Sequence, residues 1–271
     1  MIDLQSHSTV SDGELPPVEV VEAAVAAGVT TLALTDHDAI DGVAEAAIAA
    51  RIAGIVLVPA AELSCVHGSL DDMHMLGYWV DPDAIAPACD RAQRERVIRA
   101  EEIVARLNEQ GVPVRFEDAI AEAGDASSVG RPHIARAAGV QPDGMSAFFE
   151  EWLVPGAKAF VPRRWPDASE AIQLIRGAGG APVLAHPFWD MSEPNAVAAI
   201  VDDLDLDGIE CFYPAHDRAQ TTFLVELCRD RGLAATASSD FHGPSHKQFN
   251  SFGAYSTYDL GEPELPPRPA G

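Results

Sequence analysis

The stretch that decides the fold spans residues 18–38 and reads VEVVEAAVAAGVTTLALTDHD. Its first ten residues have helical spacing and stop at Gly28, a typical helix terminator. An apolar strand pattern, TLALT, follows at 31–35 and ends in the polar triplet DHD at 36–38. The segment therefore predicts a helix and then a strand whose carboxyl end carries imidazole and carboxylate groups.

The same alternation continues on both sides of this segment. We expect strands at residues 2–5, 31–35, 55–58, 73–80, 182–185, 208–212 and 233–237. Helices are expected between most of them, at 18–27, 42–53, 168–178, 195–204 and 220–231. Repeated strand–helix–strand units predict a parallel sheet or barrel, because parallel strands need crossover connections.

The pattern changes in the middle of the chain and again at its end. A long charged helix is expected at 83–110, followed by helices at 116–123, 132–138 and 145–153. We therefore divide the chain into a first barrel part (1–80), a helical insertion (81–157), a second barrel part (158–258) and a proline-rich tail (259–271). The prolines exclude the tail from a sheet interior, so we expect an extended, loosely held segment.

Composition excludes several classes of protein. The chain has 271 residues, of which 47% are hydrophobic and 22% charged, so it can bury a substantial core and is not globally disordered. No apolar run approaches the roughly 20 residues of a membrane span, and the amino terminus lacks a signal-peptide pattern. The four cysteines form no CxxC pair, which favours reduced, buried thiols in a cytoplasmic protein.

The charge balance narrows the choice of partners. Lysine and arginine number 18 against 42 acidic residues, a net charge of −24. A surface this acidic disfavours long nucleic acid and anionic membranes as partners. A small phosphorylated substrate is still compatible with this charge if bound cations invert the local field. The oligomeric state is not predicted by these features.

Histidines and carboxylates recur at the predicted strand ends. They are His7, Asp12, His37, Glu62, His74, His186, Asp240 and His242. Any one of them has an ordinary alternative as a hydrogen-bonded histidine, a turn residue or a helix cap. In a barrel, however, the carboxyl ends of the strands meet on one face. Because imidazoles and carboxylates together bind Zn²⁺, Mn²⁺ or Fe²⁺, the recurrence predicts a metal cluster.

Eight segments occur in an order and spacing that are highly specific, although a fragment such as SDG or AHP is weak alone. They are DLQSHSTVSDG, ALTDHD, VPAAELS, DDMHMLGYWVD, VGRPHIARA, GAKAFVPRRW, AGGAPVLAHP and ASSDFHGP. In these eight segments the chain resembles the PHP family, the polymerase and histidinol phosphatase superfamily of metal-dependent phosphoesterases. Within this family it most resembles the TrpH-like branch. The resemblance implies an α/β fold, a distorted (β/α)7 TIM-like barrel with a helical insertion.

The resemblance also implies a cofactor, a ligand set and a reaction. The cofactor would be two or three divalent ions: Mn²⁺, Zn²⁺ or Fe²⁺. Carried over by motif, the ligands are Gln5, His7, Asp12, His37, Glu62, His74, His186, Asp240 and His242. Four of these are also expected to be catalytic, namely His7, Glu62, His186 and Asp240. The implied enzyme is a phosphatase in which a metal-activated hydroxide attacks phosphorus. Its substrate would be a small phosphomonoester, such as a nucleoside 3′,5′-bisphosphate or a short oligonucleotide.

Gln5 departs from the family pattern, which has histidine at this position. An amide oxygen is a weaker donor to Zn²⁺ than imidazole is. Two alternatives within the fold therefore stay open: a metal- or nucleotide-binding protein with impaired catalysis, and a histidinol-phosphate phosphatase. Hydrolysis of C–N bonds, as in amidohydrolases, is disfavoured because no lysine convincingly follows a predicted strand end.

Four basic residues outside the metal set are candidate substrate ligands: Arg131, His133, Lys158 and His216. Arg131 and His133 open a predicted helix of the insertion, and an arginine there could bind a phosphate bidentately. Lys158 and His216 flank predicted strand ends. A salt bridge at the helix start is the ordinary alternative for Arg131, and an ordinary surface position is the alternative for Lys158 and His216.

Overall fold

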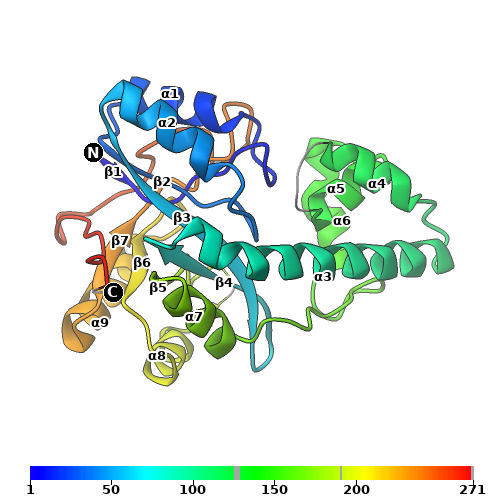
Figure 1. The fold of residues 1–271 in the computed structure, drawn as a ribbon. Coiled ribbons are helices and arrows are strands. Elements are labelled where there is room, and N and C mark those ends of the chain that lie inside the picture. Colours follow the sequence, from blue (N-terminus) through cyan, green and yellow to red (C-terminus); the bar gives the residue numbers. More distant parts are fainter. Residues whose placement is uncertain (125–128, 190, 270–271) are drawn as a thin grey trace.

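The computed structural model describes residues 1–124, 129–189 and 191–269, and within these residues seven strands form one sheet in chain order (Figure 1). The strands are β1 (Ile2–Asp3), β2 (Thr31–Leu34), β3 (Val56–His67), β4 (Leu70–Tyr78), β5 (Ala181–Leu184), β6 (Gly208–Phe212) and β7 (Ala234–Ala237). The two ends of the sheet meet: Leu4 N donates to Ala237 O at 3.0 Å, and Ser6 forms a bridge with Phe241. The result is a nearly closed α/β barrel, which confirms the predicted distorted TIM-like fold.

The fourth strand runs against its neighbours, which corrects the expectation of an all-parallel sheet. β1, β2 and β3 are mutually parallel, as are β5, β6 and β7, but β4 is antiparallel to both β3 and β5. Only residues 68 and 69 separate β3 from β4, and a connection this short cannot hold the crossover that a parallel pair needs. β3 also runs on to His67, well beyond its predicted end at residue 58.

Helices cover the outside of the barrel (Figure 1). The helices of the barrel part are α1 (Pro17–Ala26), α2 (Val43–Ala53), α7 (Ala168–Gly177), α8 (Pro194–Asp203) and α9 (Arg218–Arg231). Alternate strand residues fill the interior with an apolar cluster that includes Leu4, Val58, Leu76 and Val183. The barrel is therefore packed rather than open along its axis.

A long helix, α3 (Pro82–Glu109), connects the barrel to a helical insertion that projects to one side (Figure 1). Ile85 and Ala92, near its start, belong to the main core, whereas Ile103 and Leu107 belong to a separate apolar cluster in the insertion. The other elements of the insertion are α4 (Phe116–Ala123), α5 (Arg131–Ala137), η1 (Pro142–Gly144), α6 (Met145–Phe148) and η2 (Phe149–Leu153). The boundaries at residues 80, 157 and 258 stay predictions; residues 125–128 of the predicted insertion and 270–271 of the predicted tail lie outside the described residues.

The proline-rich tail is bound to the barrel, which corrects the expectation of a loosely held segment. Glu264 N donates to Ala235 O at 2.8 Å, and the indole of Trp79 donates to Pro266 O at 2.9 Å. Leu265 packs against the apolar cluster of the barrel interior. β1 is only two residues long, so it leaves part of the β7 edge uncovered, and the tail pairs with that edge.

Two further expectations concern the whole chain. No helix in the described residues has the length and apolar character needed to cross a membrane. All four cysteines are free and buried, as the sequence suggested.

Candidate active site

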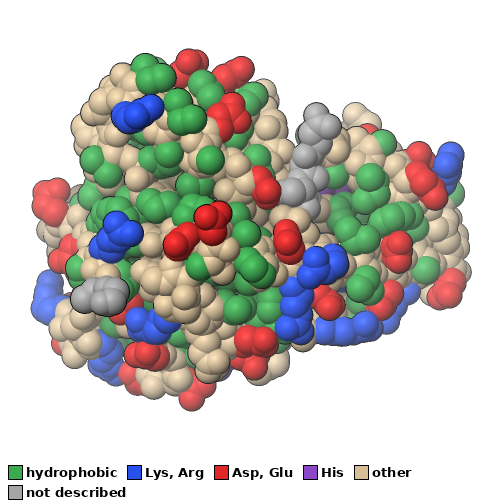
Figure 2. Space-filling view, viewed as in Figure 1, with side chains coloured by type: hydrophobic (Ala, Val, Ile, Leu, Met, Phe, Trp, Pro, Cys, Tyr) green, Lys and Arg blue, Asp and Glu red, His purple; other side chains and the backbone are tan. Residues whose placement is uncertain are grey.

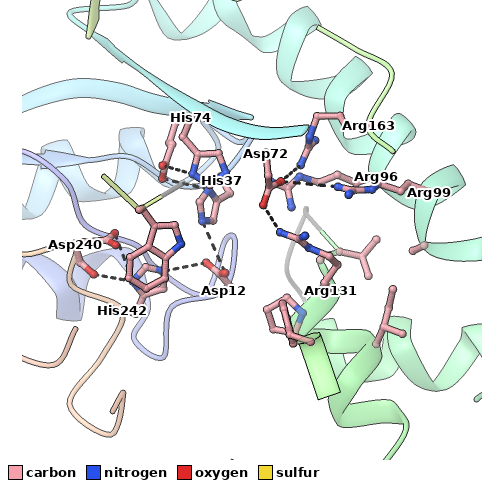
Figure 3. A pocket seen from close by; sticks show the side chains of 18 of the residues that line it. Asp12, His37, Asp72, His74, Arg96, Arg99, Arg131, Arg163, Asp240 and His242 are labelled. Carbon is pink, nitrogen blue, oxygen red and sulfur yellow. Dashed lines mark hydrogen bonds and ion pairs between the residues drawn. The ribbon is translucent and has the colours of Figure 1, made fainter. Parts of the chain in front are cut away.

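Side chains from distant parts of the sequence converge at one end of the barrel (Figure 3). They are the predicted ligands His7, Asp12, His37, Glu62, His74, His186, Asp240 and His242. Most of them follow the carboxyl ends of parallel strands. Glu62 and His74 are exceptions, because they lie within the long strands β3 and β4. Since β4 is antiparallel to β3, its amino-terminal half reaches the same end of the barrel.

The DHD triplet after β2 builds the edge of this site through three different side chains. Asp36 accepts hydrogen bonds from Ser8 and Ser11 at 2.7 Å and so fixes the loop that carries His7 and Asp12. His37 points into the cluster. Asp38 turns away from it and accepts a hydrogen bond from Ser64 N at 2.9 Å.

Glu62 lies at the centre of the cluster, where its fully buried carboxylate contacts four imidazoles. Its Oε2 is 3.2 Å from both His7 Nε2 and His37 Nδ1. Its Oε1 is 2.8 Å from His74 Nδ1 and 3.1 Å from His186 Nε2. Each oxygen of Glu62 is thus shared between two rings, an arrangement in which one carboxylate can bridge neighbouring cations.

Two aspartates extend the cluster beyond Glu62. Asp240 Oδ1 is 3.1 Å from His7 Nε2 and 3.6 Å from His242 Nδ1. Asp12 is 3.6 Å from His242 Nε2 through Oδ1 and 3.9 Å from His37 Nε2 through Oδ2. Both carboxylates therefore sit between pairs of imidazoles, as Glu62 does.

Buried neighbours hold two of these residues in uncommon backbone conformations. His186 and Asp240 have φ angles of 24° and 53°, values that non-glycine residues rarely adopt and that concentrate at functional sites. Glu210 accepts the backbone N–H of His186 at 2.9 Å, and the Tyr213 hydroxyl donates to Asp240 Oδ2 at 2.9 Å. The Tyr213 contact uses one oxygen of Asp240 and leaves Oδ1 directed at the histidines.

The electrostatics of the cluster favour a cation. Burial alone would raise the pKa of Glu62, but the neighbouring His37 and His74 outweigh it and hold that pKa well below its usual range. Burial would lower the pKa of His186, but the hydrogen bond and charge of Glu62 raise it to about 10. Burial lowers the pKa of His37 to about 3, so the pKa values that the carboxylates raise are those of His7 and His186. A divalent cation can take the place of the protons that these two rings hold.

The donor atoms fit divalent ions. Several of them are buried without a hydrogen-bond partner among the described residues: both ring nitrogens of His7, Asp12 Oδ1, His37 Nδ1, Glu62 Oε2 and Asp240 Oδ1. Two groups have ligand atoms that all lie within 4.8 Å of one another: His7, Asp12, His37 and His242, and His37, Glu62 and His74. Buried polar atoms of this kind are costly unless something binds them. Mixed nitrogen and oxygen donors suit borderline divalent metals.

Gln5 is fully buried and is less well placed for hydrogen bonding than its neighbours. Its Oε1 lies 3.5 Å from the Ser238 hydroxyl, which makes a shorter contact of 2.5 Å with Glu210. Its Nε2 has no hydrogen-bond partner within the described residues. A role of Gln5 as a metal ligand stays a prediction.

Four arginines form the side of the pocket that faces the cluster (Figure 3), and we call them the arginine wall: Arg96 and Arg99 from α3, Arg131 from α5, and Arg163. Arg96 Nε is 2.5 Å from Asp38 Oδ2, and Arg163 Nη2 is 3.3 Å from Asp72 Oδ1. Arg131 pairs with the other oxygen of Asp72. The carboxylates that pair with the wall are Asp38, Asp71 and Asp72. Four guanidinium groups against three carboxylates leave positive charge available for an anion.

Cluster and arginine wall border one pocket with a volume of about 240 Å³. The face in Figure 2 is hollowed between the barrel and the insertion, and acidic side chains are spread over it. The pocket therefore combines a cation-binding floor with a cationic wall in an otherwise acidic protein. Three aromatic residues in contact with one another, Trp189, Tyr213 and Phe249, line a further side, which we call the aromatic side. A fourth aromatic residue of the lining, Phe149, lies beside Arg131 on the arginine wall.

The structure separates the four candidate substrate ligands. Arg131 lines the pocket, but His133, Lys158 and His216 are absent from the described lining. His133 is buried and its Nδ1 accepts the backbone N–H of Gly130 at 2.9 Å. Lys158 pairs with Glu151 at 2.6 Å on the surface, and His216 contacts Cys211 O at 3.1 Å inside the core.

Sequence reasoning missed the residues that support the site from helices and strand interiors. Arg96 and Arg99 lie in RERVIR, which resembles the solvated face of a charged helix. Their spacing of three residues, which puts both on one helix face, was the available signal. Glu210 is the one acidic residue in the apolar strand GIECF, and a lone buried carboxylate of this kind signals a function.

Comparison with known proteins places the chain in a family. Residues 3–114 match the model of the PHP domain. The chain is 34% identical over 256 residues to a 3′,5′-nucleoside bisphosphate phosphatase of Chromobacterium violaceum, an alignment that covers 90% of this chain and 87% of that protein. The chain belongs to the PHP family of metal-dependent phosphoesterases. It is therefore a hydrolase.

Two other similar proteins span nearly the same length. A 5′–3′ exoribonuclease of Haemophilus influenzae is 36% identical, with 89% of this chain and 90% of that protein aligned. The solved structure of an amidohydrolase from Chromobacterium violaceum, with bound sulfate and no metal, has a TM-score of 0.86 and 31% identity. That match covers 97% of this chain and 93% of the other. These alignments cover nearly the whole chain, whereas the model of the PHP domain matches residues 3–114.

Proposed function

We propose that this PHP-family hydrolase removes a phosphate from a small nucleotide, either a nucleoside 3′,5′-bisphosphate or a short oligonucleotide. The observation that carries the proposal is the joint pocket, in which the Glu62 cluster faces the arginine wall. A substrate with two phosphates can occupy both surfaces at once, with one phosphate at the Glu62 cluster and the other at the arginine wall. Relatives that act on a nucleoside bisphosphate and on RNA support this substrate class.

In this proposal the cluster holds two or three divalent ions, with Mn²⁺, Zn²⁺ and Fe²⁺ as the candidates. The residues that would hold them are His7, Asp12, His37, Glu62, His74, His186, Asp240 and His242, with Gln5 as a weaker ninth. Bound ions would supply an activated water and offset the charge that develops on the phosphoryl oxygens. Of the chain's own groups, His7, Glu62, His186 and Asp240 are linked by contacts of 3.1–3.2 Å, and by holding the ions they would orient the reacting phosphate.

The residues around the cluster would prepare it for this task. Tyr213 fixes Asp240 through one carboxylate oxygen, so the other stays directed at His7 and His242, where it would help to hold an ion. Glu210 fixes the backbone of His186 by accepting its N–H. Arg131 would bind the phosphate that is not cleaved, because it lines the pocket at the first residue of α5. Among the described polar groups it pairs only with Asp72 and Leu153 O. Arginine binds phosphate bidentately.

The test is hydrolysis of a panel of substrates by Mn²⁺-loaded protein, followed as phosphate release from the phosphoesters and as amine release from the C–N substrate. The panel holds adenosine 3′,5′-bisphosphate, a 5′-phosphorylated trinucleotide, histidinol phosphate and an N-acyl amino acid as a C–N substrate. We expect kcat/KM to be highest for one of the nucleotides. No release from any phosphoester by metal-loaded protein would refute the proposal, and a preference for histidinol phosphate would replace the substrate class.

A variant of Arg131 tests the proposed substrate class more directly, and a variant of Arg164 serves as its matched control. Loss of a hydrogen bond to a charged group costs about 1.5–3 kcal/mol, or roughly 10- to 150-fold in binding. Arg131→Ala should therefore raise KM for the bisphosphate far more than KM for p-nitrophenyl phosphate, which has no second phosphate. Arg164→Ala is the control, because Arg164 pairs with Glu102 on the exposed side of the same region.

A further inference from the structure

The aromatic side of the pocket contains one exposed ring beside two buried ones. Tyr213 and Phe249 are buried, whereas Trp189 is 53% exposed although it lines the pocket. The ring centroid of Trp189 lies 5.7 Å from that of Phe249 and 6.4 Å from that of Tyr213. An indole left this exposed forgoes the apolar burial that usually places tryptophan in a core. Its place in the pocket therefore calls for an explanation.

The backbone of Trp189 is anchored, so its position is set by the site and not by a free loop. Trp189 N donates to His186 O at 2.8 Å, which closes a turn directly after the ligand His186. The preceding residue, Phe188, packs edge-on against Phe223 and His216 at ring distances of 6.1 and 5.7 Å. The turn is thus fixed to the cluster on one side and to the core on the other, and it holds the indole at the pocket.

The aromatic side and the arginine wall lie on different sides of the cluster. In Figure 3 the arginines are separated from Asp240 and His242 by Asp12 and His37. Tyr213 bonds to Asp240, and Phe249 lies 5.8 Å from the ring of His242, so Trp189 belongs to the Asp240 side. A substrate bound at the cluster can therefore extend in two directions, toward a cationic surface and toward an aromatic one.

We propose that Trp189 is the stacking platform for the nucleobase of the substrate. The inference rests on the proposed function, and it names the residue that would distinguish a nucleotide from a plain sugar phosphate. A nucleoside 3′,5′-bisphosphate carries three groups on one ribose, and the pocket offers one surface for each. The cluster takes the 3′-phosphate, the arginine wall takes the 5′-phosphate, and the open face of the indole takes the base. Every base has a π face, so this contact recognises a nucleobase without selecting one.

The experiment compares two substrates that differ only in the base. Adenosine 3′,5′-bisphosphate is measured against the abasic 1-deoxyribose 3,5-bisphosphate, with Mn²⁺-loaded wild-type protein, Trp189→Ala and Trp189→Phe. Base stacking on an aromatic residue corresponds to about 5- to 150-fold in affinity by alanine substitution. We expect Trp189→Ala to reduce the ratio of kcat/KM for the two substrates by that factor, mainly through KM of the adenosine compound. Trp189→Phe should restore most of the ratio.

A second readout does not depend on catalysis. Adenosine 5′-monophosphate, which has the base and the second phosphate, should quench tryptophan fluorescence of the wild type; the chain has four tryptophans, and Trp189→Ala should remove most of that quenching. An unchanged substrate ratio in Trp189→Ala overturns the inference, and so does an equal loss on both substrates, which would make the indole a general cover of the site. If wild-type protein hydrolyses neither compound, the bisphosphate as substrate is refuted, and the quenching experiment still decides whether Trp189 binds a base.

Discussion

Replacing His133 with asparagine tests whether this residue serves the fold of the insertion rather than the substrate. Its Nδ1 accepts the backbone N–H of Gly130, the residue before α5, and that contact requires an unprotonated nitrogen. Burial, and next the charge of Arg136, lower the pKa of His133 from 6.5 to about 4. Asparagine can place its Oδ1 near the same position and keep the contact, but it does not titrate.

The sign and size of the effect follow from linkage. Between pH 6.5 and pH 4 the unfolded chain binds a proton at His133 that the native chain does not, so the native state loses stability as pH falls. For pKa values of 6.5 and 4, this residue should lower the free energy of unfolding by about 2 kcal/mol between pH 7.5 and pH 5. The full loss below pH 4 would be about 3 kcal/mol.

Urea unfolding followed by tryptophan fluorescence at pH 7.5, 6 and 5 measures this difference. Other groups titrate in the same range, but they do so in both proteins, so the difference between wild type and His133→Asn isolates His133. The variant should lose about 2 kcal/mol less than the wild type by pH 5 and keep kcat/KM for adenosine 3′,5′-bisphosphate within about twofold. Parallel stability profiles together with a large rise in KM would contradict this reasoning and return His133 to the substrate-binding set.

Three other predictions concern the metals and the tail. Elemental analysis after dialysis should find two tightly held ions per chain in the wild type and three in Gln5→His, because imidazole is a stronger donor than an amide; three ions in the wild type would contradict this. Mn²⁺ added to chelator-treated protein at a hundred times its Kd should raise the free energy of unfolding by about 2.7 kcal/mol. An unchanged Tm would contradict this, because it would mean that the ion binds the folded and the unfolded chain equally well. Trp79→Phe removes the hydrogen bond to Pro266 and should cost about 1 kcal/mol and speed proteolysis of the tail, whereas equal cleavage rates would mean that the bond does not hold it.

The clustering of most of these histidines and carboxylates could be predicted because the sequence marks several strand ends twice. TLALT gives the strand and DHD gives the polar end, and the same two signals recur after β1, β5 and β7. The direction of β4 could not be predicted, because alternation of apolar residues is the same in either direction. The expected strands at 55–58 and 73–80 left a gap long enough for a crossover, and the extension of both strands into a hairpin closed that gap.

The supporting residues were harder to predict because their roles depend on tertiary geometry. Whether Arg99 faces solvent or the pocket is set by how α3 lies between the barrel and the insertion, and a charged helix pattern does not specify that. The same holds for the tail, whose prolines exclude a sheet interior but say nothing about the uncovered edge of β7. The missing information in both cases is which surfaces the barrel leaves exposed.

The path of α3 has a consequence for how this enzyme could change its substrate. Ile85 and Ala92 fix the helix to the barrel, Ile103 and Leu107 fix it to the insertion, and Arg96 and Arg99 lie between these two anchors. One residue added between Ala92 and Arg96 would turn both arginines by about 100° and move them by about 1.5 Å. Only a change of about one whole helical turn, roughly 5.4 Å, would keep both arginines facing the cluster, and we expect such a change to alter the distance between the arginine wall and the cluster while leaving every clustered histidine and carboxylate in place.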